Sequence, residues 1–258
     1  MKKRMMCIAG AMLLSGVMAQ ANITTMANGS TLSGPNSKTN TYSGASVGDY
    51  FVVLLAPNKR EQLVDYTSVI GSASTAGLQL VSFLQAAANV NHTTWGWVYS
   101  VTNAGNIQSV VSANGNNTTY IGDFLLHSAN GTLALGDTSV LSMDGETGPE
   151  YWTNSYSWAA ADDAVVMETM AGNVETFDWD KTTILRANSS TNQAVQYKEG
   201  LGSLAAYEDD FYTDTGTRWK DATTLGVVIT ETIPEPATLG MLGLVGGAIF
   251  FIRRRFMI

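Results

Sequence analysis

The feature that most constrains the fold is a series of apolar, β-branched and aromatic runs separated by turn residues. Residues 50–55 read Tyr-Phe-Val-Val-Leu-Leu, and this continuous run before Pro57 predicts a buried strand. Alternating runs follow at residues 95–101, 120–126, 132–141, 165–170 and 225–230. Asn-, Asp- and Gly-rich turn signals separate them, many about ten residues apart. This rhythm is typical of a mainly β chain, either an antiparallel sandwich or a jelly roll.

Two segments depart from the strand pattern. Residues 28–48 contain 15 Ser, Thr, Asn or Gly residues in 21, which indicates a flexible lead-in or a polar edge strand. Residues 75–89 place Leu80, Phe83, Leu84 and Ala87 on one side of a 3.6-residue period, which predicts one short helix. No long repeat is visible, so we expect a polar lead-in at 22–48 and a single β-rich ectodomain at 49–232.

The distribution of charge excludes one class of function. Residues 22–233 carry 8 basic and 21 acidic side chains, a formal charge of −13. A nucleic-acid binder needs a basic surface to displace counterions from phosphates, so we expect no nucleic-acid partner. The lone cysteine, Cys7, lies close to the N-terminus, which excludes a disulfide-stapled scaffold.

The N-terminus has the pattern of a secretory signal peptide. Lys2, Lys3 and Arg4 precede an apolar run at residues 5–18, and the small residues Ala19 and Ala21 follow at the expected −3 and −1 positions. We therefore assign residues 1–21 to a signal peptide cleaved after Ala21, with Ala19 as the alternative.

The C-terminus combines three unlike features in a fixed order. Pro234-Glu235-Pro236 holds the chain extended, because each proline fixes φ and disfavours helix in the preceding residue. Residues 237–252 carry no charge and predict a single transmembrane helix of roughly 24 Å, slightly short of a ~30 Å hydrocarbon core. A cationic cluster at the cytoplasmic side of the membrane completes the pattern: Arg253, Arg254 and Arg255.

This order resembles the PEP-CTERM sorting domain of Gram-negative bacterial surface proteins, over residues 233–258. The same domain sometimes carries an ice-binding-protein C-terminal label, which is not an activity of this chain. The resemblance implies an exosortase-type enzyme as partner, a membrane-anchored precursor, and delivery to the cell surface or to extracellular polysaccharide. It assigns recognition to Pro234, Glu235 and Pro236, and membrane orientation to Arg253, Arg254 and Arg255. A single-pass anchor that is never processed is the alternative.

Motifs for catalysis are weak. Residues 44–48 match Gly-x-Ser-x-Gly, but a polar coil precedes the motif and a strand follows, whereas a nucleophile elbow needs a strand before it and a helix after it. The two histidines, His92 and His127, lack metal-ligand spacing. A Ser-His-Asp site would have to recruit one of them. We therefore expect no enzyme and no catalytic residue.

Acidic clusters leave open a calcium site, although no EF-hand spacing occurs. The clusters are Asp162-Asp163 with Glu168, Asp178 with Asp180, and Glu208-Asp209-Asp210 with Asp214. Charge runs on an acidic domain are more often a solvated face, so we expect no cofactor. Two of these carboxylates facing each other across a cleft would indicate a glycosidase.

Aromatic residues give the remaining functional hypothesis. Six tryptophans lie in the ectodomain: Trp95, Trp97, Trp152, Trp158, Trp179 and Trp219. Exposed rings stack on sugars, whereas buried rings fill a sandwich core, and the alternating pattern around Trp95 and Trp97 favours the core. The sequence as a whole predicts an exported structural or adhesive protein, with a carbohydrate-binding module or glycosidase as the alternative.

Overall fold

The computed structural model describes most of the ectodomain. The described residues are 22–57, 66–88, 92–113, 118–146, 150–159, 163–172, 176–177, 183–188, 193–202, 204, 206–213 and 220–233. They are built of antiparallel strands and turns, which confirms the mainly β prediction. Residues Ala21–Thr232 form one compact unit, which we call the body.

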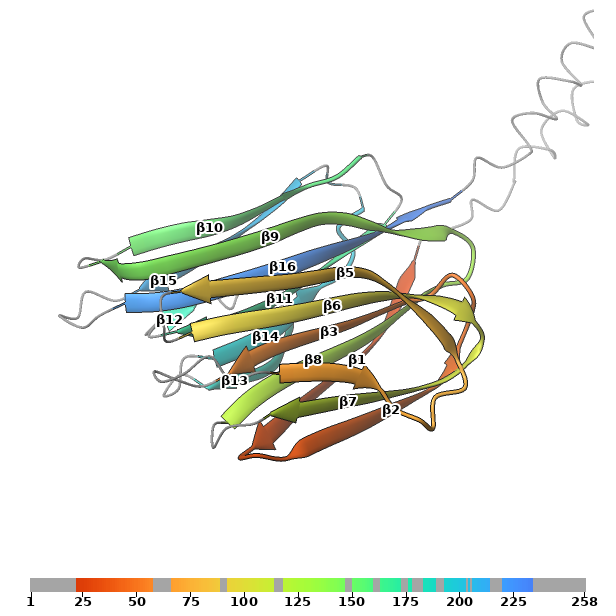
Figure 1. Cartoon of the computed structure of the whole chain (residues 1–258). Helices are drawn as coiled ribbons and strands as arrows, with labels where there is room; N and C mark the ends of the chain where they lie inside the picture. Colours follow the sequence, from red (N-terminus) through yellow and green to blue (C-terminus); the bar gives the residue numbers. More distant parts are fainter. Residues whose placement is uncertain are drawn as a thin grey trace, which may run out of the picture. The chain divides into compact units, whose positions relative to one another are not determined.

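The first half of the body is one large sheet with a small sheet on one face (Figure 1). The first large sheet has the spatial order β1 (Ile23–Ser33), β8 (Thr118–Ser128), β3 (Tyr50–Pro57), β6 (His92–Asn103) and β5 (Gly77–Ala88). The first small sheet has the order β2 (Ser37–Ala45), β7 (Gly105–Ala113) and β4 (Tyr66–Ile70). Phe51, Trp95, Trp97 and Ile107 belong to the buried cluster between these two sheets.

The second half is built in the same way. The second large sheet has the order β9 (Thr132–Glu146), β16 (Lys220–Thr232), β11 (Asp163–Gly172), β14 (Gln193–Lys198) and β13 (Thr183–Asn188). The second small sheet has the order β10 (Glu150–Ser157), β15 (Ala206–Thr213) and β12 (Thr176–Phe177). A buried cluster that includes Tyr156 and Val166 joins them.

The two large sheets pack against each other through their remaining faces. The cluster between them contains Val52, Leu54, Phe124, Val165 and Val227. The four sheets therefore form successive layers, with the small sheets outermost. The β3 strand lies in a sheet covered on both faces, so every residue from Phe51 to Pro57 is buried, and its uniformly apolar sequence is explained.

The strand order of the first half is repeated in the second. Adding eight to each label converts the order β1-β8-β3-β6-β5 into β9-β16-β11-β14-β13, and β2-β7-β4 into β10-β15-β12. A short sequence agreement accompanies this repeat: residues 39–43 of β2 read Thr-Asn-Thr-Tyr-Ser, and residues 153–157 of β10 read Thr-Asn-Ser-Tyr-Ser. The body is thus two eight-stranded sandwiches of one topology.

The polar segment at residues 22–48 forms the first two strands. β1 lies at an edge of the first large sheet and β2 at an edge of the first small sheet. Their polar residues alternate with buried ones, among them Ile23, Leu32 and Tyr42. Of the two possibilities that the sequence left open for this segment, the structure contains edge strands.

The predicted helix at residues 75–89 is wrong, because Gly77–Ala88 is the edge strand β5. Its register against β6 shifts between Leu80 and Ser82, so that Leu80 pairs with Tyr99 and Phe83 with Trp97. Tyr99 and Trp97 are two residues apart and share a face, so Leu80 and Phe83 also share one although they are three apart. The bulge therefore gives β5 two apolar residues on one face at a three-residue spacing, which is typical of a helix.

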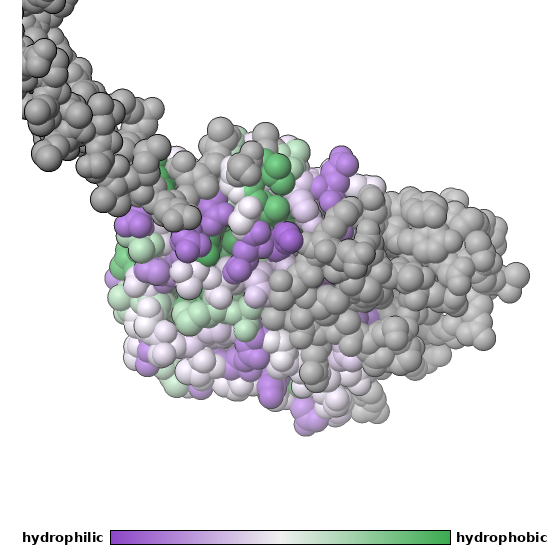
Figure 2. All heavy atoms as spheres, turned by 180° about the vertical axis from the view of Figure 1, so that it is seen from behind, coloured by the Kyte–Doolittle hydropathy of each residue, from purple (hydrophilic) through white to green (hydrophobic). Residues whose placement is uncertain are grey.

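The surface of the body is mixed. On the face shown in Figure 2, hydrophilic and hydrophobic residues of the described part alternate over short distances. Apolar residues with large exposed fractions include Leu80, Val81 and Phe83 of β5 and Val140 of β9. Both of these strands are sheet edges, where fewer neighbours cover the side chains.

Candidate functional site

The first and last described strands meet at one end of the body. Ile23 of β1 pairs with Ser128, the last residue of β8. Thr232, the last residue of β16, pairs with Thr132, the first residue of β9. We call this region the terminal end; it comprises Ile23, Asp49, residues 127–133, Asp163 and residues 231–232. It is the part of the body from which the chain continues into the predicted sorting segment.

Two buried carboxylates lie side by side on adjacent strands of the terminal end. Asp163 of β11 pairs with Glu231 of β16, and their side chains are 6% and 1% exposed. Asp163 Oδ2 accepts a 2.8 Å hydrogen bond from the backbone N–H of Ile23, and Ser128 Oγ donates to Glu231 Oε1. These bonds connect two adjacent strands of the first large sheet, β1 and β8, to two central strands of the second, β11 and β16.

A third acidic group orders the neighbouring loop. Residues 46–49 connect β2 to β3. The backbone φ is positive at Gly44 and Gly48, and Asp49 Oδ2 accepts the backbone N–H of Ser46. Asp49 Oδ1 lies 2.7 Å from Nδ1 of His127. The Gly-x-Ser-x-Gly motif therefore leads from one strand into another. The strand β2 precedes it where the sequence predicts a polar coil, and the strand β3 follows it as expected. The hydroxyl of Ser128, next to His127, donates to Glu231 and not to the imidazole.

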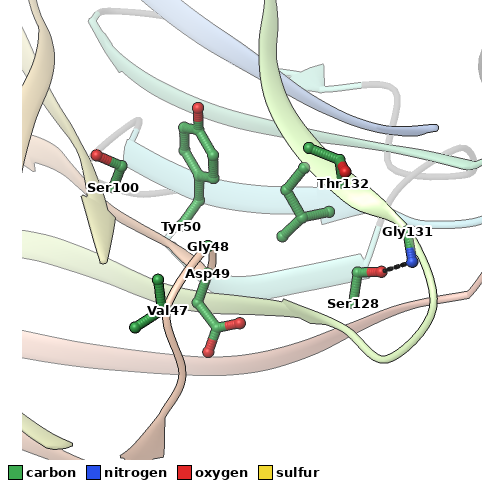
Figure 3. A pocket seen from close by; sticks show the side chains of 9 residues that line it. Val47, Gly48, Asp49, Tyr50, Ser100, Ser128, Gly131 and Thr132 are labelled. Carbon is green, nitrogen blue, oxygen red and sulfur yellow. Dashed lines mark hydrogen bonds between the residues drawn. The ribbon is translucent and has the colours of Figure 1, made fainter. Parts of the chain in front are cut away.

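A hollow of about 320 Å³ opens between this loop and the β8–β9 turn (Figure 3). Its lining is Val47, Gly48, Asp49, Tyr50, Ser100, Ser128, Gly131, Thr132 and Leu133. Ser128 Oγ also accepts the backbone N–H of Gly131 at 2.7 Å, which closes the turn. The lining offers hydroxyls and a carboxylate, and the site has no basic side chain among these residues.

A second hollow, of about 530 Å³, carries a tryptophan. Its lining includes Trp158, Asp137 and Ser157. Trp158 is half-buried, and no hydrogen-bond acceptor in the described part meets its Nε1. Asp137 accepts the backbone N–H of Ser157 at 3.0 Å. Trp95 and Trp97 are core residues, 6% and 8% exposed, whereas the side chains of Trp152, Trp179 and Trp219 lie outside the described residues.

Each half contains a buried polar centre beneath its Asn-x-Tyr strand. In the first half, Asn40 donates to the carboxylate of Asp123, and Tyr42 donates to the Asp123 carbonyl at 3.1 Å. In the second half, Asn154 and Tyr156 donate to Oε1 of Glu168 at 3.2 and 2.6 Å. The carboxylate stands on β8 in one half and on β11 in the other.

Burial changes the acidity of both centres. It raises the pKa of Asp123 to about 7, although the hydrogen bond from Asn40 acts in the opposite direction. Burial, and then the negative charge of Glu168, raise the pKa of Tyr156 well above its ordinary value. Gln196 donates to both Glu168 and Asp209, at 2.8 and 2.9 Å, and so joins the acidic residues to the second small sheet.

The acidic clusters of the sequence are divided between these environments. Asp163 belongs to the terminal end, whereas Glu168 and Asp209 belong to the second polar centre. Within the described ranges, no three or more His, Cys, Asp or Glu residues are grouped so that they could hold a metal ion. Of the other acidic candidates, Glu208 is exposed. Asp162, Asp178, Asp180 and Asp214 lie outside those ranges, as do the side chains of Asp210 and His92.

The predicted processing and membrane residues also lie outside the described part. They are Ala19, Ala21, Pro234, Glu235, Pro236, Arg253, Arg254 and Arg255. The described residues contain no helix of the length and apolarity required to cross a membrane.

The described part of the body consists of strands and turns, and a short C-terminal segment follows the body in the sequence. Residues 232–255 match the PEP-CTERM protein-sorting motif, which confirms the resemblance stated for this C-terminal segment. The motif implies an exported protein that an exosortase-type enzyme sorts. Neither a curated protein nor a solved structure matches the chain.

Proposed function

We propose that this protein is a non-catalytic structural or adhesive component of the cell surface or extracellular matrix. The observation that carries the proposal is the position of the sorting motif. The motif begins at Thr232, and Thr232 is also the last residue of β16, a central strand of the second large sheet. The motif is thus continuous with the core of the body, and its processing would decide where the whole body is delivered.

The interior of the body supports a structural role. The buried carboxylates Asp123, Asp163, Glu168 and Glu231 take hydrogen bonds from neighbouring strands, which is how buried polar groups hold layers in register. His127 is bound to Asp49 on the loop before β3. In this proposal the ionisable side chains of the described part stabilise the fold.

The delivery route follows from the two ends of the chain. A signal peptidase removes residues 1–21, residues 237–252 hold the precursor in the inner membrane, and Arg253 to Arg255 remain on the cytoplasmic side. An exosortase-type enzyme acts near Pro234-Glu235-Pro236 and releases the body to the surface or to extracellular polysaccharide.

The delivery proposal is tested in the bacterium with the full-length chain. A triple variant, Pro234→Ala, Glu235→Ala and Pro236→Ala, is compared with the wild type and with the exposed-acid control Glu208→Ala. We expect wild type and control on the cell surface, cleaved within residues 234–237 and lacking everything beyond the cut. We expect the triple variant in the membrane fraction, with Ile258 still present. Mass spectrometry of a surface-extracted wild type that still ends at Ile258 would contradict processing.

The second hollow favours one alternative, a carbohydrate-binding module. Trp158 and Asp137 pair an aromatic ring with a carboxylate, a combination that suits sugars. If the body binds matrix polysaccharide there, Trp158→Ala will reduce its retention on that polysaccharide at least tenfold, whereas Phe83→Ala, an exposed aromatic on β5, will not. Equal retention of both variants excludes this hollow, and release of reducing sugar by the wild type would contradict the non-catalytic assignment.

A further inference from the structure

Asp163 and Glu231 lie between the two large sheets. Val165 and Ile229, two residues along the same strands, belong to the cluster between these sheets. Because alternate residues of a strand share a face, Asp163 and Glu231 project toward the first large sheet, in the direction of β1. Two adjacent carboxylates are therefore enclosed where β1 begins.

Their hydrogen-bond partners are neutral. Asp163 accepts the backbone N–H groups of Ile23 and Ala164, each at 2.8 Å, and Glu231 accepts the hydroxyl of Ser128 with one oxygen. The second oxygen of Glu231, Oε2, is buried and meets no donor among the described residues. No Lys or Arg of the described part forms an ion pair with either carboxylate. Ionised carboxylates are costly to bury without a cation, so a positive charge nearby would stabilise this pair.

Ile23 is the point at which a positive charge can reach both carboxylates. Its N–H binds Asp163, and its strand partner Ser128 binds Glu231. The nitrogen of Asn22 precedes that of Ile23 by one residue, which is at most about 4 Å along an extended chain. Asn22 is exposed, so this nitrogen lies at the border between solvent and the enclosed carboxylates.

We propose that the α-ammonium group of Asn22, created by removal of the signal peptide, is the cation that these carboxylates bind. A signal peptidase hydrolyses the Ala21–Asn22 bond with one water molecule. The hydroxyl oxygen stays on Ala21, which becomes a carboxylate, and the nitrogen of Asn22 takes up protons to become an ammonium group. Maturation thus supplies the body with a charge that the precursor, with a neutral amide at this position, lacks.

The competing cation would be a metal ion. The described residues contain no group of three or more metal-binding side chains, and the other polar pair of the terminal end, His127 with Asp49, is already joined internally. The inference rests on the export step of the proposed function, and its test separates the two.

The test uses full-length protein produced with its own leader and purified from the envelope. In the test variant, Ser-Gly is inserted between Ala21 and Asn22, so that Ala19-Gln20-Ala21 is unchanged and the ammonium group moves two residues away. We expect the insertion to lower the folding equilibrium constant, measured by urea unfolding, roughly five- to thirtyfold. Combined with Glu231→Gln, the insertion should have a smaller effect than in the wild-type background, because one of the two carboxylates that it separates from the ammonium group is gone.

A matched control and a direct measurement complete the design. Asp137→Asn changes a carboxylate that binds Ser157, so the insertion should retain its full effect in that background. In the wild type, NMR titration should give the α-ammonium a pKa above its ordinary ~8, and Glu231→Gln should return it toward that value. This measurement needs no destabilised variant.

The outcomes are distinguishable. A purified protein that retains residues 1–21 overturns the export step and this inference together. A purified protein that begins at Gln20 overturns the inference and leaves export intact. An N-terminus at Asn22 with an ordinary pKa, or an equal effect of the insertion in wild type and Glu231→Gln, also overturns the inference alone.

Discussion

At the scale of single residues, Asp123 is the clearest example of an ionisable group whose charged form is destabilised by its surroundings. It is fully buried, its carboxylate has one hydrogen-bond donor, Asn40, and Oδ1 has no partner in the described part of the chain. Burial penalises the charged form, so the pKa rises to about 7. Folding therefore favours the protonated acid.

The direction of the pKa shift of Asp123 determines how its contribution to the free energy of unfolding changes with pH. Because the folded-state pKa lies above the unfolded value of about 4, this group's contribution is most favourable below pH 4 and is lost as the pH rises to about 7. We expect Asp123→Asn to change the free energy of unfolding little at pH 4 and to increase it by about 4 kcal/mol at pH 8. Urea titrations at both values check this; a gain of equal size at both would contradict it.

Gly226 shows how closely the second polar centre is packed. A Cβ atom at Gly226 would overlap the hydroxyl of Tyr156, which is 1% exposed and bonded to Glu168. We expect Gly226→Ala to destabilise the protein by about 1–3 kcal/mol. Tyr156→Phe in the same background should recover part of the loss, because the overlapping atom is removed. Thermal unfolding of the three variants measures this, and a neutral Gly226→Ala would contradict it.

At the scale of elements, the edge strand β5 differs most from the central strands. Phe83 of β5 is 48% exposed, whereas Leu54 of β3 is fully buried between the large sheets. We expect Phe83→Thr to cost less than about 1 kcal/mol and Leu54→Ala about 2–5 kcal/mol. Denaturant unfolding compares the two; a loss at Phe83 as large as that at Leu54 would show that β5 is covered in solution.

The elements also show what could be predicted from the sequence. Continuous or alternating apolar runs identified β3, β6, β8, β11 and β16, because their periodicity records which faces are buried. β5 was mistaken for a helix, since a bulge places Leu80 and Phe83 on one face. The partners of Asp163 and Glu231 could not be predicted, because Ile23 is 140 residues from Asp163 in the chain and only the layering brings them together.

At the scale of the whole molecule, the body is one topology used twice. The repeat was not visible in the sequence, because apolar residues exchange freely in buried strands and the central carboxylate changes strand, from β8 in Asp123 to β11 in Glu168. The Asn-x-Tyr of β2 and β10 is the signal that could have revealed it.

The contact between the two large sheets can be tested at one position. A Cβ atom at Gly122 of β8 would overlap Cγ1 of Val195 on β14, across the interface of the halves. We expect Gly122→Ala to destabilise the protein by about 1–3 kcal/mol and Val195→Ala to relieve most of that added loss. A double-mutant cycle in urea measures the coupling, and additive effects would contradict face-to-face packing here.

The continuity of β16 with the sorting motif has a mechanical consequence. A force applied to the body through its C-terminal attachment enters along β16, whose 13 residues pair with β9 on one side and β11 on the other. Tension along β16 must shear two ladders of backbone hydrogen bonds at once, instead of breaking the hydrogen bonds of one ladder one after another. A surface protein held in this way would resist fluid drag at its tether.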